Sequence, residues 1–461
     1  MSHQEIIQFS LNEFENLKSE KKIPGIAFGL MHDGKLIYSS GLGESVIGSG
    51  SQPTSDTVFR IASMTKSFTA KAILLLRDRG LLQLDTSITT YLPWTATIGL
   101  PVDSAPITIR NLLTMGAGLP YDDPWGDRQE SLPVSDFDEI VKKGLAFNRK
   151  VNTGFEYSNL GYALLGRIIS MVAGEDFEQF MKREIIDPLE MKASTYITEA
   201  VQDEFRAMGY AKFASGLSPE APTKNGAFTP MGGLHSSVND LAKWVSTFQL
   251  NNKTEEQTPY RYSHSVVAKA LNGHPERIIV SSYGFGLFID DDTELGRFVY
   301  HSGGYPGFGS HMRWHPESGW AIIALGNLTY APMSIASTNI MNYCAEIHMK
   351  TSKPKIDIGA YTQAAMISVN TLINDWDDSV ADKWFAVNMD LDQPREERIA
   401  ALRILTSGNS NWKPVEDSLT TPTISFAKWK MENDGGIIEV EMLMSPEKFP
   451  KIQRLIFLPA H

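Results

Sequence analysis

The sequence predicts an α+β fold: an antiparallel sheet flanked by helices, an all-helical domain inserted into it, and a small α+β domain at the C-terminal end. Three observations predict this class. Strand patterns gather at both ends of the first 350 residues, the stretch from about 105 to 260 is mostly helical, and neighbouring strands are joined by hairpin-type turns. We therefore expect a main domain over 1–350 and an accessory domain over 351–461.

The chain is predicted to open with a helix and a hairpin. The first residues space their apolar side chains as an amphipathic helix does. Strands are predicted at 25–31 and 35–39, because Asp33-Gly34 between two such runs is a strong hairpin signal. Residues 63–80 read as a buried helix that ends at Gly80.

Within the insertion, helical spacing is clear at 160–172 and 237–248, and no convincing strand alternation interrupts the region. Strand character returns after it, followed by one more helix. The predicted strands are 278–290, 297–302, 308–314 and 320–325, and the predicted helix is 333–349.

A linker is predicted at 351–355, followed by the accessory domain. Its predicted helices are 360–386 and 394–407, and its predicted strands are 423–431, 437–444 and 452–458. We find no catalytic grouping in this part of the sequence. It is expected either to cap the active site or to pair subunits, which leaves a homo-oligomer open.

Composition excludes several classes of function. The hydrophobic residues at 42%, together with 36 glycines, are normal for a globular protein of 461 residues. The net charge of −12 disfavours nucleic acid as a partner. No apolar stretch is long enough to cross a membrane and no secretory signal is visible. The single cysteine, Cys344, fits a reducing compartment, so we expect a cytoplasmic protein.

Motifs for phosphate loops, dinucleotide binding and zinc-binding helices are absent, and the ten histidines show no ligand spacing. We therefore expect neither a metal nor a cofactor.

The first chemical signal is Ser63-x-x-Lys66 at the start of the buried helix. Residues three apart share one helix face, so the hydroxyl and the amine can meet. A serine needs an adjacent base to become a nucleophile, and a lysine serves only when its pKa is lowered. The alternative is a serine cap followed by a surface lysine, which is common by chance.

Two further segments carry polar groups of the same kind. Tyr157 and Asn159 precede the helix at 160, where the phenol could carry a proton and the amide could bind a substrate amide. The alternative is a packed tyrosine with Asn159 as a helix cap. His301-Ser302-Gly303-Gly304 ends a strand whose backbone could complete an oxyanion hole, or it is an ordinary glycine turn.

Together the three segments resemble the serine β-lactamase and penicillin-binding-protein superfamily, whose pattern is Ser-x-x-Lys, then Tyr-x-Asn, then Lys/His-Ser/Thr-Gly on a strand. The order is kept at Ser63, Tyr157 and His301. The resemblance covers about 10–350 and is nearest to the branch with class C β-lactamases, D-aminopeptidases and esterases. It implies a β-lactamase-like fold.

The resemblance also implies roles. Ser63 would be acylated, Lys66 would help to remove its proton, and Tyr157 would act as general base or acid. Asn159, His301, Ser302, Gly303 and Gly304 would bind the substrate, with the backbone N–H groups of Ser63 and Gly304 as the oxyanion hole. Tyr121 and Trp125 either lie at the edge of the substrate pocket or pack in the protein core.

Many relatives have lysine where this chain has His301, and a mostly neutral histidine favours esterase or aminopeptidase action. The expected function is a serine hydrolase acting through an acyl-enzyme on Ser63. Its expected substrates are small esters, amides or D-amino-acid peptides. The alternative is a non-catalytic or very slow penicillin-binding or sensor protein.

Overall fold

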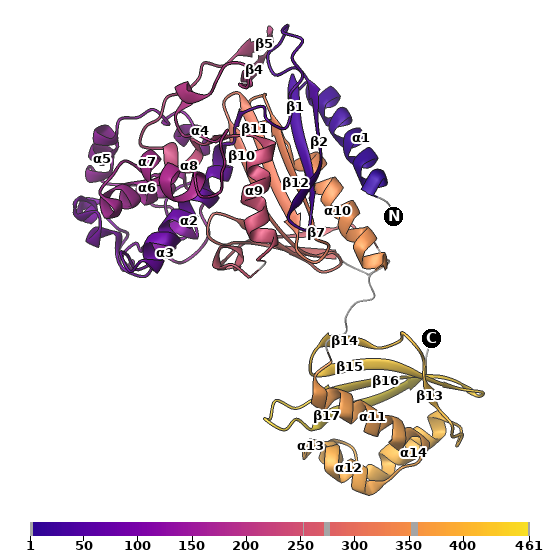
Figure 1. Cartoon of the computed structure of the whole chain (residues 1–461). Coiled ribbons are helices and arrows are strands. Elements are labelled where there is room, and N and C mark those ends of the chain that lie inside the picture. Colours follow the sequence, from indigo (N-terminus) through magenta and orange to yellow (C-terminus); the bar gives the residue numbers. More distant parts are fainter. Residues whose placement is uncertain (1–2, 252, 272–276, 352–357, 460–461) are drawn as a thin grey trace. The chain divides into compact units, whose positions relative to one another are not determined.

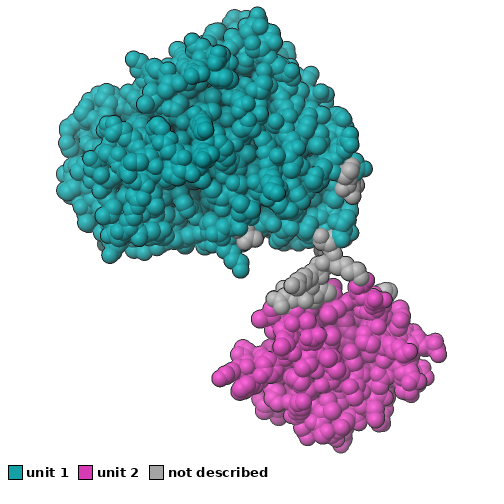
Figure 2. All heavy atoms as spheres, in the orientation of Figure 1, with its two compact units in different colours: residues 1–352 teal, residues 353–461 magenta. Residues whose placement is uncertain are grey.

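The computed structural model describes residues 3–251, 253–271, 277–351 and 358–459. The chain divides into two compact units, residues 1–352 and 353–461, coloured separately in Figure 2. The division lies beside the predicted one at 350. Of the predicted linker, residues 352–355 lie outside the described residues.

The first unit is built on an eight-stranded antiparallel sheet in the order β2-β1-β12-β11-β10-β9-β8-β7. Its strands are β1 (Gly25–His32), β2 (Lys35–Gly43), β7 (Arg261–Ala268), β8 (Arg277–Tyr283), β9 (Phe288–Asp292), β10 (Gly296–Tyr305), β11 (Phe308–His315) and β12 (Trp320–Gly326). The amino-terminal hairpin joins the later strands through β1 and β12, where Ile26 pairs with Gly326. The predicted α+β class is confirmed, and the predicted single strand 278–290 is two strands, β8 and β9.

Helices cover both faces of this sheet (Figure 1). Helices α1 (His3–Lys21) and α10 (Ser334–Thr351) pack together over one face and bury a core with Phe14, Phe28 and Ile340. Helix α9 (Val238–Gln249) packs on the other face, against β1 and β12. The larger core on that side continues into the helical region, so the catalytic candidates lie between helices and sheet.

The helix predicted at 63–80 is confirmed, since the chain is helical over residues 62–78, and it packs with helices of the helical region. The longer helices of this part of the chain are α2 (Thr65–Asp78), α5 (Val134–Lys142) and α6 (Asn159–Ala173). Its shorter elements are η1 (Ala62–Met64), η2 (Ile88–Thr90), η3 (Pro93–Thr97), α3 (Ile109–Leu113), α4 (Asp123–Gly126), α7 (Phe177–Met181), η4 (Lys182–Ile186), η5 (Thr198–Ala200), α8 (Thr229–Gly232) and η6 (Glu255–Gln257).

The expectation of a strand-free insertion is wrong. Strands β4 (Tyr210–Phe213) and β5 (Gly216–Pro219) form a small hairpin, and β6 (His235–Ser236) pairs with β3 (Phe59–Arg60). Two- and four-residue strands are too short to show a period of two in the sequence, so pattern reading misses them.

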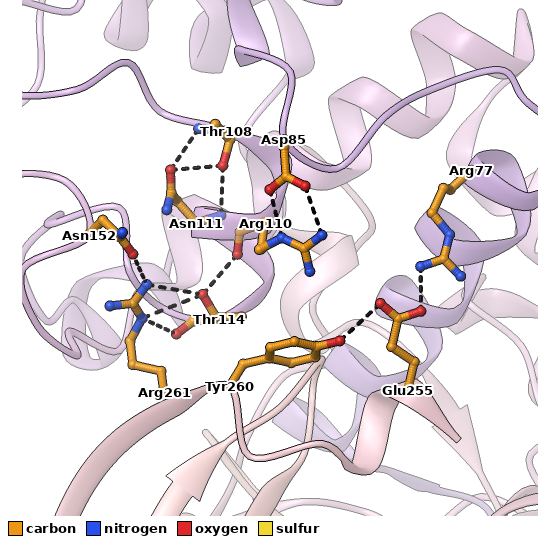
Figure 3. Close-up of polar contacts among 10 residues, drawn as sticks. All are labelled: Arg77, Asp85, Thr108, Arg110, Asn111, Thr114, Asn152, Glu255, Tyr260 and Arg261. Atoms are coloured by element: carbon orange, nitrogen blue, oxygen red, sulfur yellow. Dashed lines mark hydrogen bonds and ion pairs between the residues drawn. The ribbon is translucent and has the colours of Figure 1, made fainter. Parts of the chain in front are cut away.

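Arg261, the first residue of β7, ties the sheet to the helical region (Figure 3). Its guanidinium donates to the Thr114 carbonyl at 3.1 Å and to Asn152 Oδ1 at 2.6 Å. Met115, the residue after Thr114, accepts a hydrogen bond at its carbonyl from the backbone N–H of Glu156. Arg261 therefore helps to fix the segment that leads into Tyr157.

The second unit packs four helices against a five-stranded sheet in the order β13-β15-β16-β17, with β14 paired to β15. Its elements are α11 (Ala360–Asn374), α12 (Asp378–Trp384), α13 (Asn388–Asp392), α14 (Arg395–Leu405), β13 (Lys413–Pro414), β14 (Thr420–Thr423), β15 (Phe426–Asn433), β16 (Gly436–Met444) and β17 (Ile452–Pro459). The predicted helix 360–386 is wrong. The chain is extended at Asp375, and the Asp377 side chain caps a new helix.

Among the described residues, no helix is long and apolar enough to cross a membrane, and no three His, Cys, Asp or Glu side chains gather as metal ligands do.

Candidate active site

Ser63 lies in a short turn that leads straight into α2. Strand β3 delivers the chain to this turn, and the Ile61 amide donates to the Leu234 carbonyl beside β6. Ala62 has φ of 49°, a left-handed conformation that non-glycine residues adopt rarely and that is common at functional sites. Ser63 itself is 8% exposed. The backbone thus holds the hydroxyl in one place at the start of the helix.

Lys66 is fully buried one turn later and meets three oxygen atoms. Its Nζ lies 2.8 Å from Ser63 Oγ, 2.7 Å from Asn159 Oδ1 and 3.0 Å from the Met231 carbonyl oxygen. Met231 belongs to α8, which packs against α2. The amine is therefore surrounded by groups from three separate parts of the chain.

As an ammonium, Lys66 donates one N–H to each of the three oxygens, and the same arrangement also accommodates the neutral amine. A carbonyl and an amide oxygen only accept hydrogen bonds, so they take both N–H groups of an –NH₂. Its lone pair is then left for the proton of the Ser63 hydroxyl. The Asn159 amide is oriented for this arrangement, since its Nδ2 donates to Asp123 Oδ1 at 2.7 Å.

Burial lowers the pKa of Lys66 from its ordinary 10.5 to about 8, although nearby carboxylates favour the charged form. The opposing groups are Asp123, Asp127, Asp122 and Glu130. At pH 7 about a tenth of the amine is therefore unprotonated, far more than for an exposed lysine.

Tyr157 completes this group. Lys66 Nζ lies 4.9 Å from the centre of its ring, which packs edge-on against Tyr283. Burial, together with the charge of Asp123, raises the pKa of Tyr157 well above its ordinary value, while its interaction with the Ser63 side chain lowers it. The phenol thus stays protonated beside the serine.

Asn159 is the first residue of α6, and the alternative that it caps this helix is wrong. The cap is Ser158, whose hydroxyl accepts from the Gly161 amide. Asp122 accepts from the backbone amides of Asn159 and Leu160 at 2.6 and 2.9 Å. With the helix end satisfied by these neighbours, the Asn159 side chain is left for Lys66 and Asp123.

The predicted strand segment lies at the end of β10. Strand β9 pairs with β10 only as far as Tyr300, so residues 301–305 pair with β11 alone. Their other edge faces the turn before Ser63, where a Cβ on Gly303 would stand 2.3 Å from the Ile61 carbonyl oxygen. The glycine is required for this close approach.

His301 is buried with both ring nitrogens engaged. Nδ1 lies 2.6 Å from the Ser302 carbonyl, which can only accept, so Nδ1 carries the proton and Nε2, at 3.1 Å, accepts from the Tyr283 hydroxyl. Burial and the charge of Lys66 lower the pKa of His301 to about 3. The ring is a neutral group that holds the strand beside Tyr157.

Successive strand residues face opposite sides, and Ser302 turns away from Tyr157. Its hydroxyl lies 2.8 Å from Nδ1 of the buried His311 on β11. Gly304 approaches the ring of Tyr330, where an added Cβ would stand 2.6 Å from a ring carbon. Ser63, Lys66, Tyr157 and Asn159 are thus brought together, with Gly303 against them and Ser302 directed elsewhere.

Sequence reasoning missed several polar groups around these residues. Asp122, Asp123, Asp127 and Glu130 come from one loop, and Tyr330 hydrogen-bonds to Asp127 at 2.8 Å. Glu130 is buried and paired with Arg60 at 3.0 Å. The sequence offers one signal for this loop, the pair Asp122-Asp123 before Pro124, because carboxylates are favourable at the start of a helix.

The comparisons with known proteins agree with this arrangement. A family model described as Beta-lactamase matches residues 12–343. The chain belongs to the Beta-lactamase family. The match spans most of the first unit and includes Ser63, Tyr157 and His301.

Two curated relatives each align with this chain over 327 residues. Protein flp of Staphylococcus aureus (strain MW2) is 29% identical, over 70% of this chain and 64% of its own length. Penicillin-binding protein 4* of Bacillus subtilis (strain 168) is 25% identical, over 68% of this chain and 70% of its own length. The chain thus spans less than two thirds of the flp protein.

A solved structure extends the similarity of fold to both units. The octameric penicillin-binding protein homologue from Pyrococcus abyssi aligns over 99% of this chain and 95% of its own, with a TM-score of 0.61 and 23% identity. The predicted β-lactamase-like fold is therefore confirmed for this member of the Beta-lactamase family.

Proposed function

We propose that the protein is a serine hydrolase that forms an acyl-enzyme on Ser63, acting on small esters, amides or D-amino-acid peptides. The observation that carries the proposal is the surrounding of Lys66. Its Nζ lies 2.8 Å from Ser63 Oγ and donates to two further acceptor oxygens, so that in the neutral amine these two take both N–H groups and the lone pair is left for the Ser63 hydroxyl.

In the acylation step, the Ser63 hydroxyl gives its proton to the Lys66 amine while Oγ forms a bond to the substrate carbonyl carbon. The carbonyl π electrons move to oxygen. The backbone N–H groups of Ser63 and Gly304 are proposed to stabilise that oxyanion, which is supported by the close packing of β10 on the Ser63 turn.

When the intermediate collapses, the bond to the leaving group breaks and the leaving group needs a proton. Tyr157 is suited to supply it, because its raised pKa keeps the phenol protonated and it lies against both Lys66 and Ser63. The Lys66 ammonium then returns a proton to the phenolate. In deacylation the same groups act in reverse on a water molecule.

The neutral His301 supports ester or amino-terminal amide substrates over those with a free carboxylate beside the strand, because it offers no positive charge there. Asn159 is proposed to orient the substrate amide, and the backbone of Ser302, Gly303 and Gly304 to lie along the substrate.

The direct test is labelling with a fluorophosphonate, followed by peptide mapping and by steady-state hydrolysis of nitrophenyl acetate, nitrocefin and a D-alanyl anilide. We expect one adduct on Ser63, turnover of at least one substrate class, and loss of both in Ser63→Ala. An adduct without turnover on the whole panel would instead support the penicillin-binding or sensor alternative. No adduct on folded protein would refute the proposal.

We further propose that the chain self-associates, since the archaeal homologue of similar fold is octameric. Light scattering on the purified protein should then give a mass that is a multiple of 51.2 kDa. The cytoplasmic location stays a prediction from the sequence, based on the lack of a visible secretory signal or membrane span and on the single cysteine.

A further inference from the structure

The loop around α4 borders the proposed site from two sides. On one side, the Asn159 amide bridges Lys66 and Asp123. On the other, Tyr330 packs on Gly304 and donates its hydroxyl hydrogen bond to Asp127. Asp123 and Asp127 therefore both lie next to groups that are proposed to hold the acyl part of a substrate.

These two carboxylates have hydrogen-bond partners that are all neutral. Asp123 accepts from Asn159 and, at 2.9 Å, from the Tyr121 hydroxyl, and Asp127 accepts from Tyr330. Within the described part of the chain, no basic side chain comes within ion-pair distance of either. Arg128, the basic residue of the same loop, pairs with Glu220 instead.

Asp127 is only 3% exposed, so its charge is poorly solvated. Burial and the neighbouring Asp123 raise the pKa of Asp127 to about 7. The charge of Lys66 acts on Asp127, and the proposed mechanism leaves that amine neutral when it serves as the base. A positively charged ligand group beside Asp127 would then stabilise its charged form.

Tyr121 and Tyr330 hydrogen-bond to these carboxylates, Trp125 belongs to the same loop, and all three side chains stay open to solvent. Tyr121, Trp125 and Tyr330 are 58%, 42% and 49% exposed. Aromatic faces next to carboxylates are the combination that binds an ammonium group, through cation–π attraction and ion pairing.

We propose that Asp123 and Asp127 bind an ammonium group on the acyl part of the substrate. The site then prefers aminoacyl esters, amides or peptides with a free amino group over N-blocked or anionic acyl donors. The inference rests on the proposed function, and it assigns specificity to a loop that holds none of the catalytic groups.

The test compares two nitrophenyl esters of equal shape, 4-(trimethylammonio)butyrate and its neutral carbon isostere 5,5-dimethylhexanoate. D-alanyl nitroanilide and its N-acetyl form make a second pair. We measure kcat/KM for the full-length protein, for Asp127→Asn and for Asp187→Asn, a control that removes the same charge from an exposed carboxylate paired with Lys182.

We expect the cationic ester to be preferred by roughly tenfold or more, and Asp127→Asn to lose most of that preference, measured as the ratio of kcat/KM between the two esters. A change in the basicity of Lys66 acts on both esters alike and cancels in this ratio. The Asp187→Asn control should keep the preference. Equal rates on both esters, or an Asp127→Asn variant with unchanged preference, would overturn the inference while the hydrolase proposal stands. No turnover and no fluorophosphonate adduct would overturn both.

Discussion

At the scale of single residues, Lys66 shows how burial changes the chemistry of a side chain. A surface lysine is an ammonium ion and cannot accept a proton. Here the low polarity of the core disfavours the charge, and two acceptor oxygens hold the amine in one orientation toward Ser63. The four carboxylates of the neighbouring loop work against this effect, so the balance is set by geometry.

The pH dependence of acylation should report this balance. Because the neutral amine is the base, the labelling rate of Ser63 by a fluorophosphonate should rise about tenfold per pH unit below the Lys66 pKa and level off above about 8. Lys71→Gln is a suitable control, since Lys71 lies in the same helix but is paired with Glu256. A labelling rate that does not change between pH 6 and 9 would contradict the assignment.

At the scale of elements, the site depends on how closely β10 approaches the turn that carries Ser63. The approach is close enough that Gly303 has no room for a side chain, and Ser310 on β11 donates a hydrogen bond to the same Ile61 carbonyl at 2.7 Å. The strand edge and the nucleophile are therefore one packed unit.

Gly303→Ala should push the two apart. We expect a loss of roughly 1–3 kcal/mol in the free energy of unfolding and a larger relative loss of kcat/KM. Gly161→Ala is the matched control, because its added Cβ would meet nothing closer than 3.6 Å and alanine suits the helix. Urea unfolding measures the free energy and ester hydrolysis measures kcat/KM. A Gly303→Ala variant that keeps both values would contradict the close approach of β10 to the Ser63 turn.

A second contact between elements, made by Arg261, links β7 to the helical region. Arg261 is half-buried and holds the backbone on which the Tyr157 segment rests (Figure 3). Arg261→Met should lower kcat and cost about 1–3 kcal/mol of stability, since it removes the donor from the carbonyl of the buried Thr114. Arg110→Met, which breaks the more exposed pair with Asp85, should cost about 0–1 kcal/mol and leave kcat unchanged. Equal effects of the two variants would argue against a positioning role for Arg261.

At the scale of the whole molecule, the chain holds separate hydrophobic cores in its two units. The second unit encloses its own core around Trp429, Val440 and Leu372. Each unit therefore has the apolar burial that an independent folding transition needs.

We expect calorimetry to resolve two unfolding transitions. Covalent labelling of Ser63 should raise the temperature of one, and Val440→Ala should lower the other by about 4–8 °C for each kcal/mol that it removes from a domain of this size. A single transition that both changes move together would show that the two units unfold as one.

The sequence alone determined the α+β class and the order of the three motifs. Helix caps, hairpin turns and the pairing of Ser63 with Lys66 follow from local patterns, since they are set by near neighbours in the chain. That Tyr157, Asn159 and His301 join Ser63 was implied only by the resemblance to the family. The sequence did not predict the helix break at Asp375 or the short strands β3 to β6, because the apolar pattern of such short segments is weak.

The tertiary structure decided the rest. Lys66 is buried beside Met231, burial and the charge of Lys66 keep His301 neutral, and Tyr330 holds Asp127 near the strand. All three involve residues far apart in sequence. The proton affinity of a side chain depends on the solvent and charges that surround it in space, and the folded chain alone supplies those surroundings.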